Sequence, residues 1–156
     1  MLSKKAKYAL KAMLYLAREG DRGPVLIAEI ADREGIPKKF LEAILLALKN
    51  RGLLASRKGK GGGYALARPA AVVTFGEIVR IMDGPLAPVP CVSATAYHPC
   101  EECGDEGHCA IRIVMQEARD ALASVLDGTT LADALRRADI TPRAARGERG
   151  RPKHSA

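Results

Sequence analysis

Apolar residues recur every three or four positions in several stretches of this chain, which is the spacing of amphipathic helices. The predicted helices cover residues 3–18, 26–34, 37–51, 74–83 and 110–126, and a short last one begins near residue 130. Ser3 can cap the first helix, and Thr130 with Asp133 forms a capping box for the last. Gly35 suits the end of the second helix, and Pro37 suits the first turn of the third. Two short helices joined by such a turn predict a helix-turn-helix.

Residues 53–67 are predicted to form two short strands around a glycine-rich tip at residues 58–63. Glycine lets the backbone adopt positive φ and approach another molecule closely. Arg57, Lys58 and Lys60 place positive charge at this tip. The tip is not a nucleotide-binding loop, because no Gly-Lys-Ser/Thr opens a helix after it. A hairpin directly after a helix-turn-helix predicts a wing, so the expected fold is mainly α with a small β-hairpin: a winged helix-turn-helix.

The long helix predicted over residues 110–126 has an apolar stripe that the rest of the chain is too small to cover. The stripe consists of Ile111, Val114, Met115, Ala118, Leu122 and Val125. A homodimer interface is the favoured interpretation, and packing within one chain is the alternative. The predicted domains are a winged helix-turn-helix over 1–83, a cysteine loop over 84–109, a dimerisation region over 110–137 and a disordered basic tail over 138–156.

The net charge of +7 is distributed unevenly along the 156 residues. Residues 1–68 hold fifteen Lys and Arg against six Asp and Glu, whereas residues 69–137 hold five against ten. A basic N-terminal half favours a polyanionic partner, here double-stranded DNA, because neutralised phosphates release counterions. No apolar run approaches the roughly eighteen residues that a membrane span needs. With no export signal recognised, a cytoplasmic location is expected.

All four cysteines, Cys91, Cys100, Cys103 and Cys109, fall within nineteen residues. Clustered thiols in a reducing compartment favour metal or redox chemistry over structural disulfides. An iron–sulfur cluster, a structural zinc site and a Cys100–Cys103 disulfide switch all remain open. A thiol oxidoreductase or electron carrier would also use a C-x-x-C, but no βαβ pattern surrounds this one, so no enzyme is expected. His98 and His108 are more typical of solvent-facing loop residues than of ligands.

The order of these features resembles the bacterial iron–sulfur regulators of the IscR, NsrR and RirA family over roughly residues 2–135. The residues that carry the resemblance are Lys7-Tyr-Ala-Leu10, Gly35-Ile36, Phe40-Leu41-Glu42, Gly52-Leu53, Ser56, Gly61-Gly-Gly-Tyr64 and the cysteines before Ala110. The resemblance implies a homodimeric transcription regulator that binds a 2Fe–2S or 4Fe–4S cluster and senses iron, oxidants or nitric oxide through it.

The resemblance also implies which residues meet DNA. The helix after Pro37 would enter the major groove, where Lys38 and Lys39 could reach phosphates or guanine edges. Glu42 matches a family glutamate that can accept from cytosine N4. Phe40 replaces the usual tyrosine and so lacks its hydroxyl. In the wing, Lys58 takes the place of the usual arginine, with Arg57 before it and Lys60 two residues after it.

The metal ligands implied by the resemblance are incomplete. Cys91, Cys103 and Cys109 match the three family cysteines, but Lys7 and Arg112 stand where the family supplies its fourth ligand. Neither side chain can ligate iron, so Cys100 is the candidate fourth ligand. The sequence therefore predicts a regulator whose cluster state sets DNA affinity. The alternatives are a metal-free thiol switch and a DNA-binding protein, architectural or regulatory, with a structural zinc site.

Overall fold

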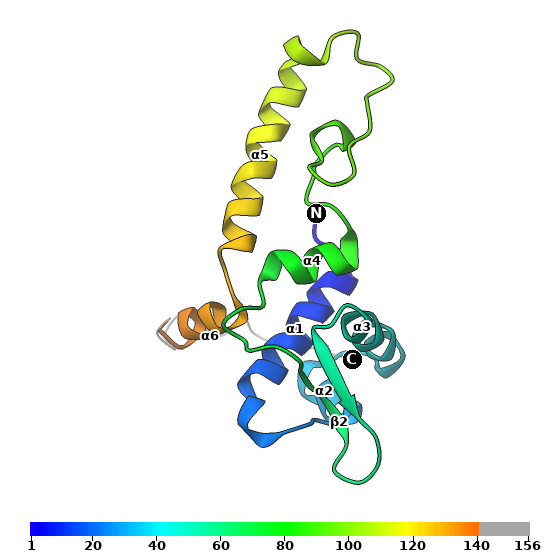
Figure 1. Ribbon diagram of the computed structural model, residues 1–156, viewed down its shortest axis with the longest axis vertical. Coiled ribbons are helices and arrows are strands. Elements are labelled where there is room, and N and C mark those ends of the chain that lie inside the picture. Colours follow the sequence, from blue (N-terminus) through cyan, green and yellow to red (C-terminus); the bar gives the residue numbers. More distant parts are fainter. Residues whose placement is uncertain (141–156) are drawn as a thin grey trace, which may run out of the picture.

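The computed structural model describes residues 1–140 and confirms a mainly helical fold with a two-stranded hairpin (Figure 1). In chain order the elements are α1 (Lys4–Arg18), η1 (Gly20–Arg22), α2 (Ile27–Glu34), α3 (Lys38–Asn50), β1 (Leu54–Arg57), β2 (Gly63–Leu66), α4 (Phe75–Asp83), η2 (Pro90–Val92), η3 (Glu106–His108), α5 (Ala110–Asp127) and α6 (Leu131–Ile140). α6 continues three residues into the stretch predicted as a disordered tail, and residues 141–156 lie outside the described part.

The helices begin and end where their capping residues predict. The Ser3 hydroxyl accepts a hydrogen bond from the Ala6 N–H at 3.0 Å and caps α1. Gly35 ends α2 in the left-handed region at φ 63°. Thr130 and Asp133 cap α6 reciprocally, each side chain accepting from the other's backbone N–H. Pro37 was predicted in the first turn of the third helix, but α3 begins at Lys38 and Pro37 is its N-cap residue.

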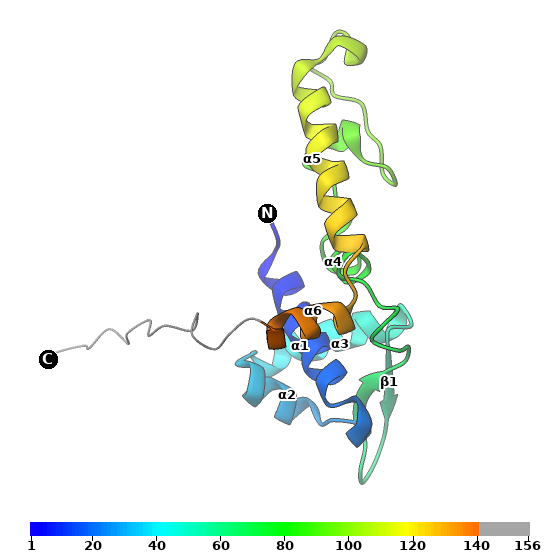
Figure 2. The same cartoon turned by 90° about the vertical axis from the view of Figure 1, so that its left-hand side faces the viewer.

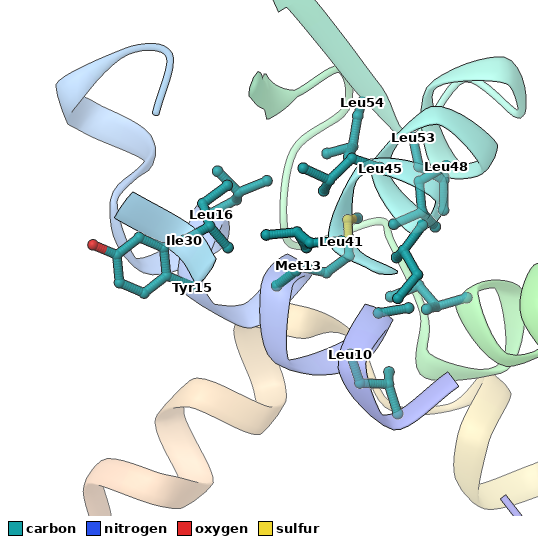
Figure 3. Close-up of a cluster of buried hydrophobic side chains, with 14 of the residues drawn as sticks. Leu10, Met13, Tyr15, Leu16, Ile30, Leu41, Leu45, Leu48, Leu53 and Leu54 are labelled. Carbon is teal, nitrogen blue, oxygen red and sulfur yellow. The ribbon is translucent and has the colours of Figure 1, made fainter. Parts of the chain in front are cut away.

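The core is built around α1, which contacts α2, α3, α4 and α6. Met13 of α1 and Ile30 of α2 are fully buried, as are Leu41 and Ile44 on the inner face of α3. Figure 3 shows side chains from these helices meeting in one cluster, with Leu53 and Leu54 at its edge. Leu131 at the start of α6 is also fully buried in this cluster, so the C-terminal helix belongs to the winged-helix body.

The hairpin is tied to the helix-turn-helix by its own backbone. β1 and β2 pair antiparallel with Ser56 opposite Tyr64. Tyr64 also exchanges both backbone hydrogen bonds with Val25, each at 2.8 Å. Gly63 adopts φ 140°, and a Cβ there would lie 2.3 Å from the Val25 carbonyl oxygen, so only glycine permits this contact. The base of the wing is therefore fixed against the segment that enters α2.

Helix α5 projects away from this body, at the end opposite the wing (Figures 1 and 2). None of its side chains is buried, and Ile111 and Val125 are 69% and 61% exposed. At its C-terminal end, Asp127 forms a two-point ion pair with Arg80 of α4, at 2.6 and 2.9 Å. Within residues 1–140, no helix is both long and apolar enough to cross a membrane.

Candidate functional site

The seven residues proposed from the sequence to meet DNA are all exposed and lie on two elements. Lys38, Lys39, Phe40 and Glu42 occupy the first turns of α3, and Arg57, Lys58 and Lys60 occupy the end of β1 and the wing tip. Phe40 is 60% exposed, which is unusual for an aromatic side chain with a core beside it. The first turns of α3 and the wing therefore present exposed basic side chains, with Phe40 as an apolar side chain among them.

A groove of about 500 Å³ runs between α3 and the wing. It brings Lys38 and Glu42 of α3 beside Arg57 and Lys58 of the hairpin. Lys39, Phe40 and Lys60 do not line it. The groove joins two of the predicted contact regions into one concave surface with cations on both sides.

The groove also contains residues that were not predicted from the sequence to contact DNA. Its lining includes Leu26 and Ile27 at the start of α2, Lys49 of α3, and Ser56 of β1. Lys49 could have been predicted from the sequence as part of this surface, because it lies seven residues after Glu42 and therefore on the same face of the helix. Leu26 could not, since only the Val25–Tyr64 pairing places it beside the wing. Its 59% exposure adds a second apolar side chain to this face.

The four cysteines, separated by up to eighteen positions in the chain, line a single pocket of about 280 Å³. Cys91 lies on η2, Cys100 and Cys103 on the loop that follows, and Cys109 immediately before α5. The remaining lining residues are Val89, Pro90, His98, Pro99, Ile111 and Arg112, and the exposed wall is almost wholly apolar. Cys91 is buried, Cys103 and Cys109 are partly exposed, and Cys100 is exposed.

The Cys103 and Cys109 side chains interact, which raises the pKa of the Cys103 thiol and lowers that of Cys109. The backbone N–H of Arg112, in the first turn of α5, donates to the Cys109 sulfur and lowers the pKa of that thiol. Burial is the main cause that raises the pKa of Cys103, and the neighbouring Cys109 raises it further. Cys109 is thus the better thiolate of the two, and Cys103 the better hydrogen-bond donor.

The thiols surround a hollow and do not converge on one point. Among the described residues, no three His, Cys, Asp or Glu side chains are placed to hold one metal ion together. His98 lines the pocket, whereas His108 is 90% exposed at its side chain and hydrogen-bonds Asp105 at 2.6 Å.

The cysteine loop is attached to α5 by polar contacts as well as by the chain. The Arg119 guanidinium donates to the Val92 carbonyl oxygen at 2.6 Å, next to Cys91. Nearer the pocket, Glu106 lies between the Tyr97 hydroxyl at 2.8 Å and Arg112 Nε at 3.8 Å. None of these contacts was visible in the sequence, because each joins residues on different elements.

A winged helix with cations on the helix and the wing defines a DNA-binding regulator, and the comparisons agree. The family described as Rrf2, iron-dependent transcriptional regulator, matches residues 2–137. The chain therefore belongs to the Rrf2 family, which confirms the resemblance found in the sequence. An rrf2-like HTH-type transcriptional regulator of Rhodobacter capsulatus is 47% identical over 138 residues, covering 86% of this chain and 92% of that one.

Solved structures of two regulators share the fold. One is CymR, described as the global cysteine regulator of B. subtilis, with a TM-score of 0.74 and 32% identity over 88% of this chain and 97% of that chain. The other is T. potens IscR, with a TM-score of 0.71 and 29% identity over 96% and 93%. The relatives are transcriptional regulators, and this chain is one by family membership.

Proposed function

We propose that this chain is a homodimeric transcription regulator whose DNA affinity is set by an iron–sulfur cluster bound at Cys91, Cys100, Cys103 and Cys109. The observation that carries this proposal is that all four thiols line one pocket at the start of α5. Thiolates are the usual ligands of such clusters, and four are enough for either a 2Fe–2S or a 4Fe–4S centre. The description of the Rrf2 family as iron-dependent transcriptional regulators points the same way.

The residues around the thiols suit such a group. The pocket wall is apolar, which limits access of water to the sulfurs, and the first turn of α5 presents backbone N–H groups to Cys109. Lys7 and Arg112 stand where the resembling family has its fourth ligand, and Cys100 replaces them from within the same loop. The ligand set would then be complete in one protomer. When bound, the cluster supplies a centre that iron shortage, oxidants or nitric oxide can alter.

A change in the pocket has a direct route to the DNA-binding body. The cysteine loop is held to α5 by Arg119, and α5 is held to α4 by the Arg80–Asp127 ion pair. Helix α4 packs on α1 and on α3, the second helix of the helix-turn-helix. We therefore expect a rearrangement of the loop to move α5 relative to the body, and with it the spacing of two recognition helices in a dimer.

The DNA contacts assigned to each element follow from its chemistry. In the proposed complex α3 lies in the major groove, where Lys38 and Lys39 meet phosphates or guanine edges and Glu42 accepts from cytosine. Arg57, Lys58 and Lys60 of the wing approach the adjacent minor groove. Exposed Phe40 has no hydroxyl for a phosphate, so its contribution would be apolar contact, for which a thymine methyl is suited.

The homodimer is supported by an apolar face of α5 that no other segment within residues 1–140 buries. Val114, Leu122 and Val125 on this stripe are between 44% and 61% exposed. A contiguous apolar stripe on a projecting helix is typical of a protein interface. A second copy of α5 is the natural occupant, because two-fold pairing covers both stripes at once.

The test is anaerobic purification and reconstitution, with a visible spectrum and analysis of iron, acid-labile sulfide and zinc. Iron and sulfide in equal amounts would support the cluster. Both should be lost in the double variant Cys103→Ser/Cys109→Ser and kept in the control variant His108→Ala. A DNA sequence that binds the protein can then be selected in vitro. Its affinity for the cluster-loaded protein should differ at least tenfold from its affinity for the cluster-free protein. A colourless protein with stoichiometric zinc would overturn the proposal in favour of a structural site.

A thiol switch is the second candidate, favoured by the interaction between the Cys103 and Cys109 side chains. Oxidation by a peroxide would join the two sulfurs as a disulfide, the two thiols losing two electrons and two protons as the peroxide is reduced to water and alcohol or a second water. The interaction of Cys103 with Cys109 supports a second possible pairing beside the Cys100–Cys103 pair that the C-x-x-C suggested. Mass spectrometry of peroxide-treated, metal-free protein separates these pairings, and peroxide-dependent DNA binding without iron would favour this candidate.

A further inference from the structure

One charged side chain in the cysteine pocket has a buried hydrogen-bond donor that no residue accepts. Within the described part of the chain, Arg112 Nε is the one buried side-chain nitrogen or oxygen without a hydrogen-bond partner. The nearest carboxylate oxygen, on Glu106, is 3.8 Å away, which exceeds the usual N–H···O limit of about 3.2 Å. A buried donor left unpaired costs free energy, so an acceptor outside the protein atoms is the expected explanation.

The surroundings hold Arg112 over the pocket. The Tyr97 hydroxyl lies 2.8 Å from both oxygens of the Glu106 carboxylate and shares its one proton between them, and Glu106 also forms a longer ion pair with Arg112. This carboxylate is fixed by Tyr97 and keeps the guanidinium near the pocket without satisfying its Nε. Arg112 lines the same pocket as the four cysteines, and its side chain is only 30% exposed.

We propose that Arg112 donates its Nε–H to the sulfur held in this pocket and supplies the positive charge that balances it. The inference rests on the proposed function, in which the four cysteines hold an iron–sulfur cluster. Arginine stays protonated in proteins and has no free lone pair, so it cannot replace a ligand. Four thiolates bring four negative charges, which iron and sulfide only partly neutralise. A fixed cation one helical turn after Cys109 therefore stabilises the most negative state of the centre.

Arg112 is thus a positioning and charge-balancing residue, and its effect should appear in the reduction potential. Reduction adds an electron to the cluster, and a nearby cation stabilises the reduced form more than the oxidised one. Removing the charge should favour the oxidised form. At a fixed potential, Arg112→Gln should lower the ratio of reduced to oxidised cluster at least tenfold, which is 59 mV for one electron.

The experiment is a redox titration of reconstituted protein followed by electron paramagnetic resonance. Wild type is compared with Arg112→Gln, with Arg112→Lys, which keeps the charge, and with Arg136→Gln, which removes the same charge from an exposed position on α6. We expect the reduction potentials of Arg112→Lys and Arg136→Gln to lie near that of wild type, and the potential of Arg112→Gln to lie well below it. Circular dichroism of the metal-free proteins checks that every variant folds.

Each outcome decides a different statement. A cluster in wild type and an unchanged potential in Arg112→Gln overturn the role of Arg112 and leave the proposed function intact. No iron and sulfide in wild type overturn the proposed function, and the role of Arg112 with it. If Arg112→Gln folds but takes up no cluster, the Arg112→Lys variant provides the test. A normal cluster in Arg112→Lys supports the charge-balancing role, and an Arg112→Lys protein that also lacks a cluster overturns it.

Discussion

The winged-helix body and the projecting arm, defined as α5 with the cysteine loop over residues 84–109, are built on opposite principles. In the body, Met13, Ile30 and Leu41 are completely buried, and the core is closed by residues from both ends of the described chain. In the arm, α5 buries no side chain, and its apolar stripe faces outward. Burial of apolar area is the main source of stability in a small domain. The body can therefore hold its own shape, whereas the arm has little burial of its own, and in the proposed function its shape depends on the cluster in its pocket and the second subunit on its stripe.

The largest expected effect comes from the body's core. Leu41→Ala should lower the free energy of unfolding by about 2–5 kcal/mol, because it leaves a cavity at a fully buried position. Leu46→Ala changes the same residue type in the same helix at a 51% exposed position, and should cost less than about 0.5 kcal/mol. Denaturant unfolding of both variants gives the comparison. Equal losses would contradict the view that the body's stability comes from this core.

The next effect concerns the stripe on α5. Val125→Asp should raise the dissociation constant of the proposed dimer by about ten- to a hundredfold, since one buried valine contributes roughly 1.5–3 kcal/mol. Ser124→Asp adds the same charge on a different face and serves as the control. Sedimentation equilibrium measures both. If Val125→Asp associates as wild type does, the exposed stripe is not the interface.

A smaller effect is expected at the wing. Lys58→Ala should weaken DNA binding at every sequence, and should reduce the slope of log affinity against log salt by about 0.9, the value for one phosphate contact. Arg136→Ala, in α6, removes an exposed cation away from the groove and should leave the slope unchanged. Fluorescence anisotropy at several salt concentrations measures the slope. An unchanged slope in Lys58→Ala would remove Lys58 from the proposed interface.

The smallest effect is expected where the body meets the arm. Arg80 lowers the pKa of Asp127 below its ordinary value of 3.8. A depressed carboxylate pKa gives stability that is full above the unfolded value and is lost as the pH falls through the folded one. Both side chains are more than a third exposed, so the contribution at neutral pH is about 0.2–1 kcal/mol.

Asp127→Asn should remove this contribution at pH 7 and leave stability nearly unchanged at a pH low enough to protonate the carboxylate in the folded state, as measured by thermal unfolding across that range. A loss of the same size at both pH values would show that the aspartate acts through packing and not through its charge. Gly76 touches Asp127 closely enough that the comparison needs the isosteric asparagine and not alanine.

Contacts between neighbours in the chain were the predictable ones. The caps at Ser3 and Thr130 and the left-handed Gly35 depend on residues at most a few positions apart, and each lies where the pattern placed it. The cysteine spacing predicted a shared site, and the structure brings all four thiols to one pocket. The unpaired Nε of Arg112 could not be predicted, because it depends on where Glu106 and Tyr97 settle.

The sequence by itself determined the order of helices, the hairpin and the apolar face of each helix, because these follow from local propensity and periodicity. It also supplied the candidate residues for the proposed DNA and cluster sites. Only the tertiary structure decided that Leu26 and Ser56 join the groove, that Arg80 holds Asp127 across forty-seven positions, and that α5 remains uncovered. The reason is physical: long-range pairings are set by how complete elements pack together, which no short stretch of residues encodes.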